Sequence, residues 1–230
     1  MNKHVTAIIL AAGSSTRMNL NVTKQKILIG SESVLHRAVR VFNECADIDS
    51  IIVVARADEQ DFAKRETSEF QKVTEITVGG KTRAESASLG FGLVSSDIEF
   101  VAVHDAARCF VTSEMISAVI RDAEVYGAAT ASCKSVDTVK RINSDGAVES
   151  TIPRDEIRCV QTPQVFRADL YKKALSGVDL SDLSITDDNI LLERIGVFPH
   201  CTDTGSNNIK ITTQNDVALA NFLIFGGTNV

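Results

Sequence analysis

The sequence has no tryptophan and only three prolines and two tyrosines among its 230 residues. A proline-rich or aromatic-lined recognition surface is therefore not expected. No apolar run approaches the roughly 20 residues of a membrane span. Residues 1–4 also lack the apolar segment and cleavage site of a signal peptide. We therefore expect a cytoplasmic protein with no membrane partner.

Positive charge and metal-binding motifs are also scarce. The chain has 24 lysines and arginines against 30 acidic residues, a formal net charge of -6. Nucleic acids and anionic membranes attract basic surfaces, so neither is an expected partner. The five cysteines form no Cys-x-x-Cys pair and the four histidines are scattered, which argues against a zinc or dithiol redox site.

Two common nucleotide-binding fingerprints are missing. No Gly-x-Gly-x-x-Gly follows the first apolar run, which weakens the case for NAD or FAD. Gly80-Lys81-Thr82 resembles the end of a P-loop, but that motif requires a glycine where Glu75 stands. A nucleotide site would therefore need another construction.

The apolar patterning nevertheless predicts one large α/β domain. Apolar residues make up 44% of the chain, enough for a sizeable core. Strand-like runs alternate with helical patterns, which is typical of a mostly parallel sheet with helices on both faces. The predicted strands are 5–11, 50–55, 73–78, 100–104, 128–132, 159–166 and 208–212. The predicted helices include 34–42, 58–70, 84–94, 113–126 and 214–225.

One segment, 134–158, interrupts this alternation. Residues 136–142 and 147–152 are β-like, and Asn143-Ser-Asp-Gly146 between them has turn chemistry. We expect a hairpin that projects as a β-arm from the single domain, residues 1–230. An isolated hairpin is marginally stable in water. The arm is therefore predicted to pack on a second subunit and form a homodimer.

Polar or basic residues follow three of the predicted strands. These segments are Ala11–Arg17, Gly79–Arg83 and His104–Arg108. Ligands of parallel α/β sheets bind beyond the carboxyl ends of the strands. The three segments therefore predict a binding site at one edge of the sheet.

The first segment suits a phosphate chain. Ala11, Ala12 and Gly13 have little or no side chain, so backbone amides can approach phosphate oxygens. Arg17 and Lys24 would add positive charge where phosphoryl transfer builds negative charge. Spacing alone leaves a plain turn with surface cations as an equal alternative.

The other signals each have an ordinary structural alternative as well. Asp105 suits a magnesium ligand beside phosphates, or a turn cap. Arg108 could hold a second anion. Lys210 either points into a cleft or lies on the solvent face of an edge strand. Thr138, Thr162 and Arg154 suit a phosphorylated polyol, or are common β-surface residues.

Taken together, these motifs resemble one family. Leu-Ala-Ala-Gly-Ser-Ser-Thr-Arg-Met, Lys-Gln, His-Asp-Ala-Ala-Arg, Asp-Thr-Val-Lys-Arg, Gln-Thr-Pro-Gln-Val-Phe, Ile-Thr-Asp-Asp and Asn-Ile-Lys-Ile-Thr occur in this order. The chain is similar over its length to the 2-C-methyl-D-erythritol 4-phosphate cytidylyltransferases. The resemblance implies a Rossmann-like three-layer nucleotidyltransferase fold, CTP as co-substrate, Mg²⁺ as the divalent cation and an arm-linked homodimer.

The resemblance also implies roles for individual residues. Arg17, Lys24, Arg154 and Lys210 would be catalytic. Ala11, Ala12, Gly13, Gly80, Arg83, Ser86 and Asp105 would bind CTP, and Asp105 would also hold the metal. Arg108, Thr138, Thr162 and Thr186 would line the acceptor site, with Thr138 and Arg154 reaching across the dimer.

Two rival functions stay open from the sequence. Ribitol-5-phosphate cytidylyltransferases resemble this family closely and differ in the polyol acceptor. A non-catalytic nucleotide-binding module is the other alternative. Such a module has no need for Arg17, Lys24, Asp105 and Lys210 together, so we expect an enzyme.

Overall fold

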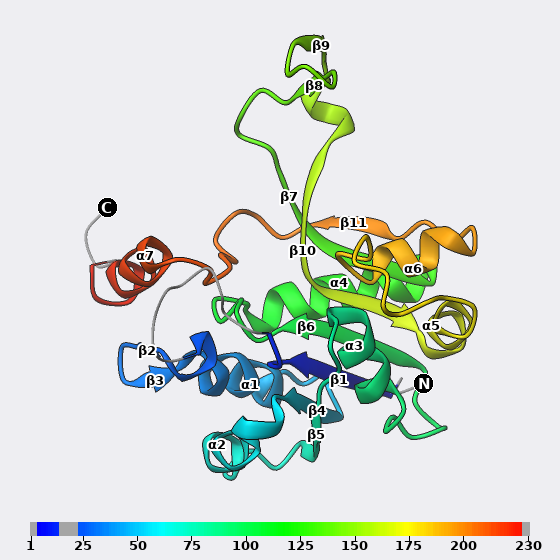
Figure 1. Ribbon diagram of the computed structural model, residues 1–230. Coiled ribbons are helices and arrows are strands. Elements are labelled where there is room, and N and C mark those ends of the chain that lie inside the picture. Colours follow the sequence, from blue (N-terminus) through cyan, green and yellow to red (C-terminus); the bar gives the residue numbers. More distant parts are fainter. Residues whose placement is uncertain (1–3, 14–22, 227–230) are drawn as a thin grey trace.

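The computed structural model describes residues 4–13 and 23–226. A seven-stranded sheet with the order β11-β7-β10-β6-β1-β4-β5 forms its centre (Figure 1). The strands are β1 (Val5–Leu10), β4 (Ser50–Ala55), β5 (Val73–Val78), β6 (Phe100–Asp105), β7 (Ala128–Lys134), β10 (Arg158–Arg167) and β11 (His200–Asp203). Only β10 runs antiparallel to its neighbours in this sheet. The predicted mostly parallel α/β sheet is therefore confirmed.

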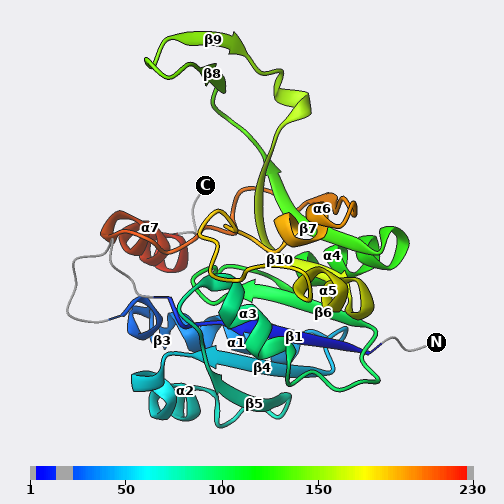
Figure 2. The same ribbon diagram turned by 45° about the vertical axis from the view of Figure 1, so that its right-hand side comes forward.

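Helices cover both faces of the sheet (Figure 2). The helices are α1 (Val34–Glu44), α2 (Gln60–Thr67), α3 (Arg83–Phe91), α4 (Ser113–Tyr126), α5 (Ala168–Leu175), α6 (Asn189–Arg194) and α7 (Gln214–Phe225). Side chains alternate along β1, so Ala7 and Ile9 pack in one apolar cluster and Ile8 in the other. Helices α1, α2 and α4 contribute to the first cluster, and α3, α5 and α6 to the second.

Helix starts follow from capping side chains. The sequence predicts Ser31 or Ser33 as the N-cap of the helix at 34–42. Ser33 holds this position, because its Oγ accepts a hydrogen bond from the His36 amide at 3.1 Å. For α4 the sequence predicts Ser113 as the N-cap, and this prediction is wrong. Thr112 holds the extended cap position, and its hydroxyl accepts from the amide of Met115.

Near the carboxyl end, two strand predictions are wrong. Residues 208–212 form no strand, because the Ile211 amide donates to the Ala107 carbonyl in the loop after β6 rather than to a sheet edge. Strand β11 was not predicted, since its four residues, His-Cys-Thr-Asp, show no apolar pattern. It pairs in parallel with β7 and forms an edge of the sheet.

The segment predicted as an arm contains a separate two-stranded sheet. Strands β8 (Lys140–Ile142) and β9 (Val148–Thr151) pair antiparallel and are shorter than predicted. Figures 1 and 2 draw them apart from the central sheet, beyond the ends of β7 and β10. All seven side chains are exposed, including the apolar Ile142 and Val148. Whether this surface joins two subunits stays a prediction.

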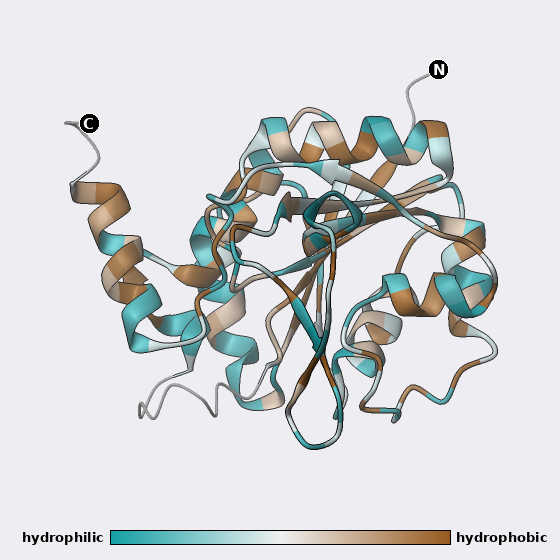
Figure 3. Cartoon of the chain, turned by 90° about the horizontal axis from the view of Figure 1, so that it is seen from above, coloured by the Kyte–Doolittle hydropathy of each residue, from teal (hydrophilic) through white to brown (hydrophobic). Residues whose placement is uncertain are grey.

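The last helix, α7, lies at one side of the molecule. Asn221 of α7 accepts a hydrogen bond from the Gly30 amide, between β2 (Leu28–Ile29) and β3 (Glu32–Ser33). Brown, hydrophobic turns recur along this helix next to the C terminus in Figure 3, and Phe222 and Phe225 are exposed. No helix within the described ranges is both long and apolar enough to cross a membrane.

Helix α3 approaches the sheet closely at one glycine. A Cβ atom on Gly90 would lie 2.6 Å from Cγ2 of Ile8 on β1 and 2.8 Å from Cγ2 of Val54 on β4. Both partners are fully buried, so they have no room to move away. The close approach of α3 to the sheet therefore requires a residue without a side chain at position 90, which is Gly90.

We expect Gly90→Ala to lower the free energy of unfolding by about 1–3 kcal/mol, because overpacking outweighs the helix propensity of alanine. Urea denaturation measures this difference. Gly92→Ala is the control, since its Cβ would meet nothing closer than 3.5 Å. Equal stability of the two variants would contradict the close-packing argument.

Candidate active site

A cavity of about 400 Å³ opens at the carboxyl ends of the central strands. Its lining comes from six separate stretches of the chain. The residues are Leu10, Ala12, Gly13, Lys24, Gln25, Arg56, Gly80, Lys81, Thr82, Arg83, Ser86, Asp105, Ala107 and Lys210. Eight of the predicted site residues are among them: Ala12, Gly13, Lys24, Gly80, Arg83, Ser86, Asp105 and Lys210.

The segment after β1 forms one wall. A Cβ atom on Gly13 would lie 3.4 Å from Nζ of Lys24, so the lysine lies directly beside the glycine backbone. Lys24 belongs to a short 3₁₀ helix, η2 (Lys24–Lys26). The Ala11 amide donates to the Val54 carbonyl at 2.7 Å and its side chain is buried, so this amide is already used within the sheet. Ala12 and Gly13 line the cavity.

The turn after β5 forms the facing wall. A Cβ atom on Gly79 would lie 2.4 Å from Cβ of Ala12, so the two turns pack together only because this residue is glycine. Ser86 Oγ accepts a hydrogen bond from the Gly80 amide at 3.1 Å. Thr82 caps α3 through a reciprocal pair of bonds with Glu85, which fixes the residue that follows it, Arg83.

Asp105 pairs with two of the cations that line the cavity. Its Oδ1 accepts from Nε of Arg83 at 3.1 Å and its Oδ2 accepts from Nζ of Lys210 at 2.6 Å. Burial alone would raise the pKa of the Asp105 carboxyl, but the charges of Arg83 and Lys210 hold it well below its usual range. The carboxylate is therefore ionised at neutral pH and fixes two cations at one point of the wall.

A buried hydrogen-bond network supports Asp105 from behind. Thr162 Oγ1 accepts from the Asp105 amide at 3.1 Å and lies 3.1 Å from Nδ1 of His104. His104 Nε2 faces the Arg108 carbonyl at 3.3 Å, and a carbonyl only accepts, so Nε2 carries the proton and Nδ1 accepts from the threonine hydroxyl. Burial lowers the pKa of His104 to about 3, and the imidazole is neutral.

Arg108 and Lys210 are tied to the same network. Arg108 Nη1 donates to the Asn208 carbonyl at 2.9 Å, and the Asn208 side chain donates to the Thr162 carbonyl at 2.8 Å. Burial lowers the pKa of Arg108. The irregular segment 208–212 thus attaches to the loop after β6 and to the middle of β10, and this brings Lys210 to the cavity.

Seven predicted site residues are not among the lining residues, and six of them lie in the described part of the chain: Ala11, Arg108, Thr138, Arg154, Thr162 and Thr186. Thr162 is buried behind the cavity. Thr138 and Arg154 lie in the arm segment, both exposed, with Nη2 of Arg154 donating to the Thr138 hydroxyl at 3.1 Å. Thr186 is exposed in the loop before α6. Arg108 is half-buried next to the cavity residue Ala107, and Arg17 lies outside the described residues.

The structure also adds residues that the sequence reasoning missed. Arg56 and Lys81 bring two further cations to the cavity wall. Arg56 directly follows β4, so the rule about strand ends would have found it. Asp188 is fully buried and binds Arg83, a contact between residues 105 positions apart that no sequence pattern indicates.

A known protein family matches nearly the whole chain. The family described as "IspD: 2-C-methyl-D-erythritol 4-phosphate cytidylyltransferase" matches residues 5–225. A relative of that name from Clostridium acetobutylicum is 38% identical over 221 residues, covering 95% of this chain and 96% of the relative. Another from Clostridium novyi is 36% identical and covers 95% of each chain.

The chain belongs to this family. It is therefore a cytidylyltransferase, as the motifs predict. A crystal structure of 4-diphosphocytidyl-2C-methyl-D-erythritol synthase from Anaerococcus prevotii is similar to it with a TM-score of 0.86 and 30% identity, over 97% of this chain and 99% of that one. The nucleotidyltransferase fold is thus confirmed from a solved structure as well.

We expect Thr162→Val to lower the free energy of unfolding by about 1–3 kcal/mol, because the buried Asp105 amide and His104 Nδ1 lose their partner. Urea denaturation measures this effect. Thr186→Val makes the same chemical change at an exposed position and is expected to stay within about 0.5 kcal/mol of wild type. A silent Thr162→Val would mean that the hydroxyl does not support Asp105.

Proposed function

We propose that this cytidylyltransferase transfers CMP from CTP to 2-C-methyl-D-erythritol 4-phosphate, a step of isoprenoid precursor synthesis. The products are 4-diphosphocytidyl-2-C-methyl-D-erythritol and pyrophosphate. One observation carries the proposal. Lys24, Arg83, Lys210 and Asp105 come from four separate regions of the chain and line one cavity beside the small-residue turn at Ala12-Gly13.

The reaction needs alignment and charge neutralisation more than acid-base chemistry. A phosphate oxygen of the acceptor attacks the α-phosphorus of CTP in line, and pyrophosphate leaves. A phosphate monoester is already anionic near neutral pH, so no general base is required. The amides of Ala12 and Gly13 would orient the triphosphate, and Lys24 and Lys210 would neutralise charge in the transition state. The resemblance assigns Arg17 to the same task.

A magnesium ion fits this cavity through a single carboxylate. The described residues contain no cluster of three or more His, Cys, Asp or Glu side chains that could hold a metal. Magnesium needs no such cluster, because it keeps several waters and binds one or two carboxylates together with substrate phosphates. Asp105, 13% exposed at the cavity wall, would hold it. When bound, the ion would neutralise phosphate charge.

The acceptor would bind on the side of the cavity where Arg108 and Thr162 support Asp105. In this proposal the arm of a second subunit completes the site, with Thr138 and Arg154 reaching the acceptor. The exposed Ile142 and Val148 support an interface on the arm. A cytoplasmic location is part of the same proposal. The ribitol 5-phosphate alternative is not favoured, since the matching family and relatives are named for methylerythritol phosphate.

With CTP and MgCl₂, we expect the purified protein to release pyrophosphate rapidly with 2-C-methyl-D-erythritol 4-phosphate and slowly with ribitol 5-phosphate.

Lys24→Ala is expected to lower kcat about 100-fold or more, because a cation that acts on developing charge is lost. A coupled pyrophosphate assay measures both effects.

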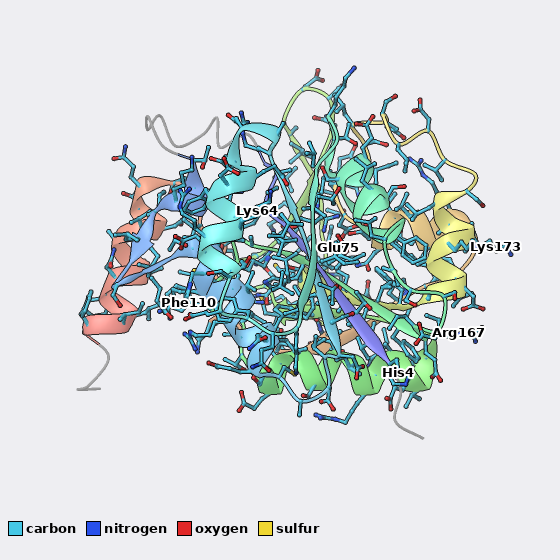
Figure 4. All side chains as sticks on the ribbon, turned by 90° about the horizontal axis from the view of Figure 1, so that it is seen from below. His4, Lys64, Glu75, Phe110, Arg167 and Lys173 are labelled. Carbon is cyan, nitrogen blue, oxygen red and sulfur yellow. The ribbon has the colours of Figure 1, made fainter. Side chains whose placement is uncertain are left out.

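The matched control is Lys64→Ala, an exposed lysine on α2 (Figure 4) that is not among the residues lining the cavity. It is expected to retain the wild-type rate. Preference for ribitol 5-phosphate would overturn the acceptor, and wild-type turnover by Lys24→Ala would overturn the role of this lysine. CTP binding with no pyrophosphate release from either acceptor would favour a binding module.

A mixed dimer tests whether Arg154 acts in the partner's site. Lys24→Ala and Arg154→Ala are each expected to be nearly inactive. In a co-expressed mixture, a mixed dimer has one site with both defects and one intact site, so about a quarter of the wild-type activity should return. Activity no higher than that of the separate variants would mean that Arg154 acts within its own subunit or not at all.

A further inference from the structure

Arg83 is held from two sides. Its Nε donates to Asp105 at 3.1 Å, and its Nη1 donates to Oδ2 of Asp188 at 2.5 Å. The third nitrogen, Nη2, has no hydrogen-bond partner in the part of the chain that the structure describes. Burial alone would lower the pKa of Arg83, but the charges of Asp188 and Asp105 raise it. The guanidinium is therefore a fixed cation in the cavity wall with one donor group left over.

Burial and hydrogen bonds hold Asp188 itself in place. It is fully buried, and its Oδ1 accepts from the Tyr171 hydroxyl at 2.6 Å. Its amide donates to Oε1 of Gln164 at 2.9 Å. The ring of Tyr171 packs against Phe166 at 5.2 Å and edge-on against Phe91 at 5.1 Å. Strand β10 and helices α3 and α5 thus fix the carboxylate from several directions.

The position of Asp188 in the chain predicts a different use. It stands at the N-cap of α6, where an aspartate side chain usually accepts a hydrogen bond from the first turn of the helix. Asp188 makes no such bond. Asp187 accepts from the Ile190 amide at 3.2 Å instead. The carboxylate of Asp188 is therefore free of the capping role and is directed to Arg83 and Tyr171.

We propose that Asp188 is a positioning residue of the nucleotide site, which fixes the Arg83 guanidinium at the cavity wall and is itself oriented by Tyr171. This inference rests on the proposed role of Arg83 in binding CTP. Asp188 does not line the cavity, so it acts through the arginine and not on the substrate. The ion chain Lys210–Asp105–Arg83–Asp188 thus ends on a carboxylate that has no contact with solvent.

A double-mutant cycle separates this role from a structural one. We expect Asp188→Asn to raise the KM for CTP about tenfold and to leave the KM for 2-C-methyl-D-erythritol 4-phosphate within about twofold of wild type. In an Arg83→Ala background, Asp188→Asn should add nothing further. Tyr171→Phe should raise the KM for CTP about threefold, because the carboxylate keeps the arginine but loses one orienting bond.

Matched controls exist for both substitutions. Asp187→Asn changes the neighbouring carboxylate, and Tyr126→Phe changes the other tyrosine of the chain, which is exposed. Both are expected to leave the KM for CTP within about twofold of wild type. If Asp188→Asn fails to fold, Tyr171→Phe is tested in the wild-type and Arg83→Ala backgrounds instead.

The outcomes distinguish this inference from the proposed function beneath it. If Arg83→Ala leaves the KM for CTP unchanged, the role of Arg83 fails, and the inference fails with it. If Arg83→Ala weakens CTP but the effect of Asp188→Asn is equal in both backgrounds, only the inference is overturned. A lower melting temperature of Asp188→Asn with both KM values unchanged would likewise overturn it, since the carboxylate would then serve stability alone.

Discussion

The pairing of Asp105 with Arg83 and Lys210 is the interaction on which the site depends. One carboxylate, at the end of the central strand β6, brings together a cation from the first residue of α3 and a cation from the irregular segment 208–212. Without the acid, two positive charges would repel each other in a partly buried wall. The packing of β6 and the capping of α3 therefore do more than stabilise the fold, because they also place Asp105 next to Arg83.

The fold makes this pairing available by a simple geometric rule. Strands β1, β4, β5 and β6 are parallel, so their carboxyl ends meet at one edge, where the turns of Ala12–Gly13 and Gly79–Gly80 also lie. Gly79 permits the two turns to pack at a distance that any side chain would prevent. The small residues thus have two uses, since they expose backbone amides and let the walls approach each other.

Much of this was readable from the sequence, and the failures have physical reasons. The alternation of apolar runs predicted the sheet, and the motif order predicted the family and most of the cavity lining. The strand at 208–212 was wrong because an alternating pattern does not reveal whether a sheet edge is available. Ala11 belongs to the small-residue segment whose amides were expected to bind phosphate, but its amide already donates to the Val54 carbonyl. The contacts of Asp188 with Arg83 and Tyr171 could not be predicted, because they join residues that only the tertiary fold brings together.

Strand β10 has a consequence of its own. Its first residues pair with β7 at the base of the arm, the register then shifts between Val160 and Gln164, and within this irregular stretch Thr162 supports Asp105. One continuous backbone thus joins the distant hairpin to the carboxylate that gathers the cations. Strand β10 therefore carries both the attachment of the hairpin and the hydroxyl that supports Asp105, so a substitution that alters its backbone would affect both.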